Sequence, residues 1–206
     1  MSPTRSGLSK KPGSRAAETR AKPSTLGSTY LAVFAANPFT ANAVQAAVIN
    51  AIGVLTCQAM PLLSGGEFQF DWKPIAIFMS IGAFVITPLV LTVLIGRIFR
   101  LGLTKLQTLL VCTLFGTFVI GGAFEVSFGV LNEVFSGKGI ADIQLSTILA
   151  GLFTSKFLWG NLESRIVFLP ADVLNTYFVP PVYQPLVSNI AGYIWTVVLA
   201  ARASSS

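Results

Sequence analysis

Glu125 is the residue whose setting most clearly suggests chemistry, because it interrupts a long apolar run over residues 106–131. Inserting a carboxylate at bilayer depth costs about 2.5 kcal/mol or more. A nearby cation, a water-filled cavity or protonation of the acid must offset that cost. Glu125 is therefore either a pore-lining or proton-coupled carboxylate, or a structural acid that is neutral or paired with Arg165 or Lys156.

A second group of polar residues lies closer to the C-terminus and comprises Glu163, Arg165, Asp172 and Asn175. Asp172 and Asn175 are three residues apart, so a helix presents them on the same side. They could line a polar path opposite Glu125. Alternatively, the charges form an interhelical salt bridge that allows a broken segment to sit in the membrane. Both interpretations predict partners for these side chains inside a helix bundle.

Other familiar chemistry is not indicated. The sequence has no histidine, which removes the usual general base and the commonest metal ligand. Its two cysteines, Cys57 and Cys112, lie in apolar runs and are expected to be packing residues. Neither Gly-Gly pair is followed by the Gly-Lys-Ser/Thr of a phosphate-binding loop. We therefore expect no catalytic residue, no metal site and no cofactor.

The composition predicts a membrane protein. Hydrophobic residues make up 53% of the 206 residues and charged residues only 11%, whereas a soluble domain carries roughly 25% charged residues. So few charges cannot cover a compact globule with polar surface, and lipid is the expected solvent. We expect an all-α, polytopic bundle of about four transmembrane helices, with an interfacial amphipathic helix and a re-entrant or broken segment.

The positive charge is concentrated at the N-terminus, where residues 1–29 carry six Lys or Arg against the single acid Glu18. This segment has almost no apolar residues and is expected to be a disordered tail. It would set the topology or contact anionic lipid. The remaining chain is nearly neutral, so nucleic acid is not an expected partner. Residues 30–202 would form one membrane-embedded bundle, and residues 203–206 a short polar C-terminus.

Four apolar segments predict spanning helices, which need about 20 residues each. The first covers about residues 39–60 and follows Pro38, a residue tolerated at a helix start. Uncharged or nearly uncharged runs supply the others, at residues 74–96, 106–131 and 173–201. A short interfacial helix is expected over residues 30–36. Ala43, Ala47 and Ala51 recur at every fourth position and predict a close-packing face on the first span.

Residues 137–172 have a different pattern. Apolar residues at helical spacing between Leu145 and Phe153 predict a helix at the interface or against the bundle. Residues 156–172 then mix apolar and charged side chains, which favours a segment that re-enters the bundle. A fifth full span is the competing interpretation.

The charges of the connections predict an orientation. The connection with Arg97, Arg100 and Lys105 lies an even number of spans from the tail, and both are basic. Residues 61–73 and 132–142, on the opposite side, carry an excess of acid. The positive-inside rule then places the N-terminus on the cytosolic side, or on the matrix side of a mitochondrial membrane.

Aromatic, proline, glycine and amide residues follow a recognisable order over residues 30–200: Tyr30, Pro38, Gly53 and Gln58, then Asp71, Pro74, Gly82 and Pro88, and finally Pro170, Asn175, Val179, Pro180, Asn189 and Trp195. This order resembles that of the family containing the mitochondrial Mpv-seventeen protein and the 22-kDa peroxisomal membrane protein. The resemblance implies a helix bundle in an organelle membrane with a channel-like role.

The sequence also departs from that family's pattern at several polar positions. Leu91 stands where a histidine is usual and Val54 where an acid is usual. Gln184 replaces an arginine, and Asp172 replaces a glutamine. The resemblance therefore implies the architecture more firmly than a specific transport role.

Three functions follow as hypotheses. The resemblance implies a channel or permeability protein for small solutes, with the peroxisomal membrane favoured over the mitochondrial inner membrane. The small-residue face and the missing polar residues favour a non-catalytic protein that self-associates to shape, tether or sort an organelle membrane. A membrane-embedded enzyme acting on a lipid or isoprenoid, with Glu125 and Asp172 as acids, is supported only by those two carboxylates.

Overall fold

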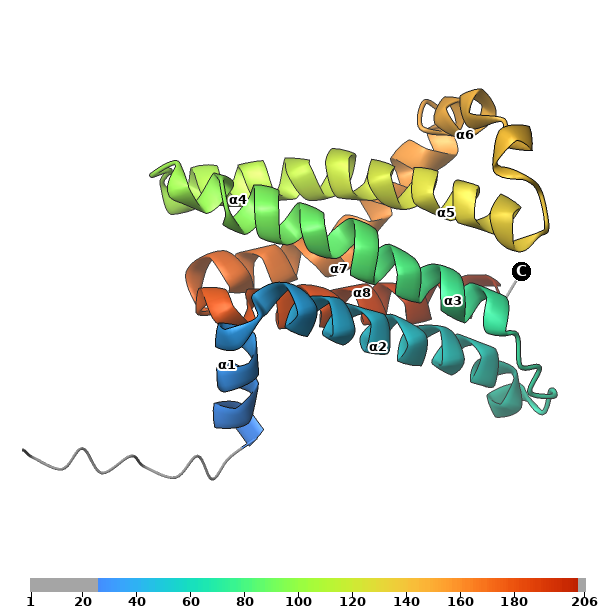
Figure 1. Cartoon of the computed structure of the whole chain (residues 1–206), viewed down its shortest axis with the longest axis horizontal. Coiled ribbons are helices and arrows are strands. Elements are labelled where there is room, and N and C mark those ends of the chain that lie inside the picture. Colours follow the sequence, from blue (N-terminus) through green and yellow to red (C-terminus); the bar gives the residue numbers. More distant parts are fainter. Residues whose placement is uncertain (1–25, 204–206) are drawn as a thin grey trace, which may run out of the picture.

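The computed structural model describes residues 26–203, and these form an all-α bundle (Figure 1). Residues 1–25 of the predicted tail (residues 1–29) lie outside the described part of the chain. The last four residues of that tail already belong to α1 (Leu26–Ala36). Of the predicted polar C-terminus, only Ala203 is described, as the last residue of α8 (Gln184–Ala203).

Three helical segments are long and apolar enough to cross a membrane: Pro38–Leu63, Trp72–Leu94 and Lys105–Phe135. The first consists of α2 (Pro38–Ala59) and most of η1 (Met60–Ser64). The second joins α3 (Trp72–Ile81) to the π-helical turns η2 (Gly82–Ile86) and η3 (Leu89–Ile95). The third joins α4 (Lys105–Leu114), the π-helical η5 (Phe115–Ile120) and α5 (Gly121–Phe135). The first three predicted spans are confirmed to within a few residues.

Each of these segments begins where a side chain caps the helix. Asn37 accepts a hydrogen bond from the backbone N–H of Thr40 at 3.2 Å, and Asp71 accepts one from that of Lys73 at 2.9 Å. Thr104 and Gln107 form a reciprocal capping box at the start of α4. Such caps satisfy backbone donors that a helix N-terminus leaves without partners.

The C-terminal region differs from the prediction. Residues 155–177 form one continuous helix, α7 (Ser155–Tyr177), instead of a re-entrant or broken segment. The uncharged run 173–201 is not one helix, because it is interrupted after α7 by a turn with Pro180 and Pro181, which includes η7 (Pro181–Tyr183). Proline lacks a backbone N–H and disfavours helical geometry in the preceding residue. The competing interpretation is right that this region is one helix, but α7 is not among the segments of residues 26–203 that are long and apolar enough to cross a membrane.

The five long helical segments lie alongside one another, with α1 at one end and α6 (Leu145–Gly151) at the other (Figure 1). Helix α2 packs against α3 and α8, and α7 packs against α4 and α8. The predicted helix within residues 145–153 is confirmed as α6. Its Ile148 lies against Gly129 of α5, where a Cβ atom would be 2.9 Å from the isoleucine side chain.

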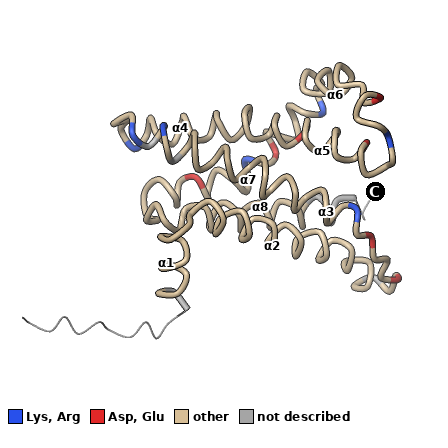
Figure 2. Tube along the Cα trace, viewed as in Figure 1, with Lys and Arg blue, Asp and Glu red and all other residues tan. Residues whose placement is uncertain are grey.

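Most charges gather at the two ends of the bundle (Figure 2). We call the end with Arg97, Arg100 and Lys105 the basic end; there Lys105 Nζ lies 5.3 Å from the ring centre of Tyr177, beside the α7–α8 turn. We call the opposite end the acidic end. It includes the connections 64–71 and 136–144, and Lys73 Nζ in the first turn of α3 donates a 2.7 Å hydrogen bond to Ser136 Oγ in the second connection.

Close helix approach depends on small residues other than the predicted alanines. Ala46 and Gly53 are buried, whereas Ala43, Ala47 and Ala51 are only half-buried. A Cβ atom on Gly53 would lie 3.4 Å from Tyr193 of α8. The sequence correctly predicts that α2 packs through small residues. The face that packs is displaced by about one position from the predicted face of Ala43, Ala47 and Ala51.

Gly82 provides a test of the α2–α3 contact. A Cβ atom there would collide with the Asn50 amide, which donates a 3.3 Å hydrogen bond to the Phe78 carbonyl. We expect Gly82→Ala to lower the free energy of unfolding by about 1 kcal/mol through loss of that bond. Gly122→Ala is the matched control, because nothing lies within 4 Å of its Cβ position. Alanine there should raise helix stability by up to about 1 kcal/mol, measured by unfolding in detergent micelles.

Candidate functional site

The bundle has polar residues inside and large apolar residues outside. Asn42, Thr87, Thr108, Ser164, Asn175 and Gln184 are all buried. In contrast, Phe84 is 77% exposed, Ile166 73% and Leu110 56%. This distribution is unfavourable in water and suits lipid, where apolar side chains can face the solvent and polar groups must find partners within the protein.

An ion pair lies halfway along α7. Arg165 Nη1 is 3.8 Å from Asp172 Oδ2, and both side chains are about four-fifths shielded by the protein. Since both residues belong to α7, the pair is within one helix and not between helices as predicted. Thr113 of α4 completes the contact: its hydroxyl donates to Asp172 Oδ2 at 3.4 Å, and its carbonyl accepts from Arg165 Nη1 at 3.5 Å.

The third span makes room for the Arg165 guanidinium. Gly116, in the π-helical η5, lies so close that a Cβ atom would be 3.2 Å from Arg165 Nη1. Ser164 Oγ accepts from Arg165 Nη2 at 3.3 Å, and the Phe168 ring centre lies 5.3 Å from the guanidinium carbon. A π-helical turn redirects backbone carbonyls and often marks a functional position. Here the carbonyl of Thr113, just before η5, faces the arginine.

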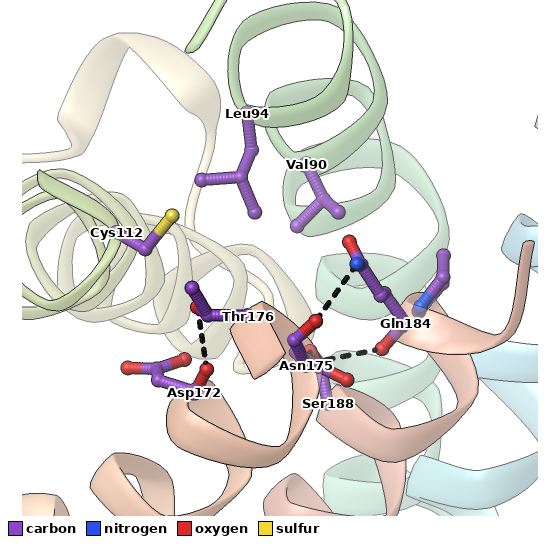
Figure 3. A pocket seen from close by; sticks show the side chains of 9 residues that line it. Val90, Leu94, Cys112, Asp172, Asn175, Thr176, Gln184 and Ser188 are labelled. Atoms are coloured by element: carbon purple, nitrogen blue, oxygen red, sulfur yellow. Dashed lines mark hydrogen bonds between the residues drawn. The ribbon is translucent and has the colours of Figure 1, made fainter. Parts of the chain in front are cut away.

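Two amide side chains hold α7 and α8 together at the basic end (Figure 3). Asn175 Nδ2 donates to the Gln184 carbonyl at 3.3 Å and to Ser188 Oγ at 3.0 Å. Gln184 Nε2 donates in return to the carbonyls of Asn175, at 2.9 Å, and Val179, at 3.1 Å. The last carbonyls of a helix have no partner within it, so Gln184 caps the end of α7.

A cavity of about 20 Å³ lies between η3, α4, α7 and α8, and Figure 3 shows side chains that line it. Its polar lining includes Asp172, Asn175, Thr176, Gln184 and Ser188, and its apolar lining includes Val90, Leu94, Cys112 and Pro185. Within residues 26–203, Asn175 Oδ1 is buried and has no hydrogen-bond partner. The cavity therefore joins the ion pair to the amide pair.

The structure brings together three of the predicted polar residues, Arg165, Asp172 and Asn175. It does not bring Glu125 to them: Glu125 is exposed on α5 and does not line the cavity. The ion pairs found among the described residues are Lys138–Glu133 and Arg165–Asp172, so Glu125 pairs with neither Arg165 nor Lys156. Glu163 is exposed on α7.

The residues that carried the resemblance mostly occupy helix starts, turns and helix contacts. Tyr30 stacks on Tyr183 with 5.7 Å between ring centres and donates to Gln45 Oε1 at 3.1 Å. Gln58 exchanges two hydrogen bonds with the backbone of Asp71, at 2.6 and 3.1 Å. The others lie as follows: Pro38 begins α2, Pro88 precedes η3, Pro170 lies inside α7, Pro180 lies in the α7–α8 turn, and Asn189 and Trp195 belong to α8.

Sequence reasoning did not select Thr113, Gln184 or Ser188 as site residues. In the sequence, Gln184 stands out only as a departure from the pattern of the family that the chain resembles. Thr113 was hidden in an apolar span, where the one available signal was its spacing of four residues from Thr117. In the structure, the Thr117 hydroxyl donates a hydrogen bond to the Thr113 carbonyl at 2.7 Å.

The apolar exterior, the polar interior and three helices of spanning length define an integral membrane protein of the all-α helix-bundle class. Residues 155–200 match the Mpv17 / PMP22 family, and this partial match supports divergent membership of that family. The matched segment contains α7 and most of α8, and therefore Arg165, Asp172, Asn175 and Gln184. No curated protein and no solved structure shows a significant match to the chain.

Proposed function

We propose that this organelle membrane protein is channel-like and raises the permeability of its membrane to small solutes. The Arg165–Asp172 pair and the adjoining amides, held inside a bundle with an apolar exterior, carry the proposal. Charged residues at bilayer depth are costly and commonly mark ion or solute pathways. The path would follow α7 where it faces α4 and α8.

The size of the cavity limits what could pass without movement. About 20 Å³ accommodates one water molecule. A larger solute would therefore require α4, α7 and α8 to separate, and the Lys105–Tyr177 contact at the basic end would have to open.

The direct test is solute release from liposomes that contain the purified protein. Liposomes loaded with sugars and polymers of graded size should release the smallest solutes and retain the largest, whereas protein-free liposomes should retain all of them. Liposomes that stay as tight as the protein-free ones at high protein load would overturn the proposal.

The cellular location belongs to the same proposal. We favour the peroxisomal membrane, with the mitochondrial inner membrane as the alternative, and place the basic end on the cytosolic or matrix side. Fluorescent tagging with organelle markers distinguishes the two membranes. Protease protection of a tag at the N-terminus tests the orientation.

Self-association is a second candidate role, and the exposed face of the third span favours it. Leu106, Leu110, Leu114 and Phe118 recur at every fourth position and are all more than half exposed. Glu125 lies seven residues after Phe118, and a carboxylate facing lipid would gain from a polar partner on another copy. Cross-linking in native membranes should trap dimers or larger species; a strict monomer would exclude this role.

A further inference from the structure

We propose that the cavity beside Asp172 is a water-binding vestibule that is hydrated from the basic end of the bundle only. Hydration does not require conduction, so this inference stands apart from the proposed permeability. A bundle that conducts nothing could still hold such a vestibule.

The location of the lining residues supports one-sided hydration. Asp172, Asn175 and Thr176 lie in the last turns of α7, and Gln184, Pro185 and Ser188 lie in the first turns of α8. Cys112 is seven residues from the start of α4. At 1.5 Å per residue, the cavity begins within about 10 Å of the basic end.

The buried polar atoms that lack partners supply a second observation. Among the described residues these are Asn42 Oδ1, Gln45 Nε2, Arg165 Nε, Asn175 Oδ1 and Asn189 Nδ2. Asn42, Gln45, Asn175 and Asn189 belong to the half of their helix nearer the basic end, and Arg165 lies at the midpoint of α7. Buried polar groups in proteins are almost always hydrogen-bonded, to ordered water where no protein group is available. The basic half of the interior therefore requires water.

The groups around the cavity match the hydrogen-bonding needs of water. Asn175 is 8% exposed, and its Oδ1 atom can accept a hydrogen bond. The Asp172 carboxylate offers further acceptor sites besides those used by Arg165 and Thr113. A water molecule can donate to Asn175 and to Asp172 while the Ser188 hydroxyl donates to it, which gives three partners within the usual range. An unpaired cation fits less well, because Arg165 already balances Asp172.

The vestibule ends at the Arg165–Asp172 pair. Beyond it, the Ser164 hydroxyl donates to the Asn161 carbonyl of the same helix at 2.7 Å, and the Asn161 amide donates to the Phe157 carbonyl at 2.9 Å. These two polar side chains in the acidic half of α7 therefore donate to carbonyls of their own helix. Water entering from the basic end therefore stops near the middle of the helix.

Cysteine labelling tests this directly. In a protein with Cys57→Ser and Cys112→Ser, Ser188→Cys places a thiol in the vestibule, and Leu174→Cys places one at similar depth on the exposed face of α7. The probe is Ag⁺, a membrane-impermeant cation that binds thiolates and is small enough for a cavity that holds one water molecule, applied to each side of oriented proteoliposomes. Arg100→Cys and Lys138→Cys mark the basic and acidic sides.

From the basic side, Ser188→Cys should react at least about tenfold faster than Leu174→Cys, because the reactive thiolate forms only where water reaches it. From the acidic side it should not react, while Lys138→Cys does. Equal rates for Ser188→Cys and Leu174→Cys, or reaction from both sides, would overturn the proposal.

The native thiol provides a variant close to the natural protein. With only Cys57→Ser, Cys112 remains as the sole thiol and lines the same cavity. It should be labelled from the basic side alone. If Ser188→Cys does not fold, failure of Cys112 to react from that side decides against the vestibule.

Discussion

Asp172→Ala is expected to lower the free energy of unfolding by about 3 kcal/mol, because it leaves a buried guanidinium without its counter-ion. The Arg165 side chain is only 17% exposed, and Asp172 is its ion-pair partner. The variant also removes the acceptor for the Thr113 hydroxyl, which weakens the contact between α4 and α7. Unfolding in mixed micelles, followed by circular dichroism, measures the loss.

The double variant Arg165→Met with Asp172→Leu separates the charge effect from packing. Replacing both partners by apolar residues of similar size is often nearly neutral, so most of the stability should return. Asp142→Ala, in the exposed connection at the acidic end, serves as the control and should change stability by less than about 0.5 kcal/mol. A double variant as unstable as Asp172→Ala would show that the ion pair is not the cause.

Gln184→Leu should have a comparable effect at the α7–α8 turn. The substitution removes the donor that serves the Asn175 and Val179 carbonyls, and Gln184 is 9% exposed. Leaving the buried Asn175 carbonyl and the partly buried Val179 carbonyl unsatisfied is expected to cost about 2–3 kcal/mol. The same unfolding measurement applies, with Trp195 reporting the transition of α8 in a background that carries Trp72→Phe and Trp159→Phe.

Gln144→Leu is the matched control for this prediction. Gln144 is exposed and bonds only locally to Thr147, at 3.3 Å, among its recorded contacts. Its substitution should therefore have little effect. If Gln184→Leu proved as mild as Gln144→Leu, the amide pair would not be what holds α7 to α8.

Hydropathy predicted the first three spans well because a helix that spans a lipid bilayer needs a long apolar run, and such a run is visible directly in the sequence. The same rule failed after residue 172. Hydropathy does not register the break at Pro180 and Pro181, although the two prolines themselves indicate it, and the charges of α7 concealed a continuous helix. In that region, backbone chemistry and internal pairing determine the structure more than mean hydropathy does.

The polar site was predicted in part. The cost of burying charge identified Arg165 and Asp172 without any structure. Their partner Thr113 lies 59 positions from Asp172 in the sequence, and no spacing rule connects residues so far apart. Glu125 illustrates a further limit, because the sequence places it at membrane depth but does not determine whether it faces the interior or the exposed surface.

Ion selectivity across a planar bilayer tests most directly whether the α7 site lies on the permeation path. Asp172→Asn leaves the charge of Arg165 uncompensated, so the cation-to-anion permeability ratio should fall at least about tenfold. Glu125→Gln also removes one carboxylate within the membrane, but away from the cavity, and should leave the ratio unchanged. The reversal potential should shift for Asp172→Asn alone. An unchanged ratio for Asp172→Asn, or a larger shift for Glu125→Gln, would contradict it.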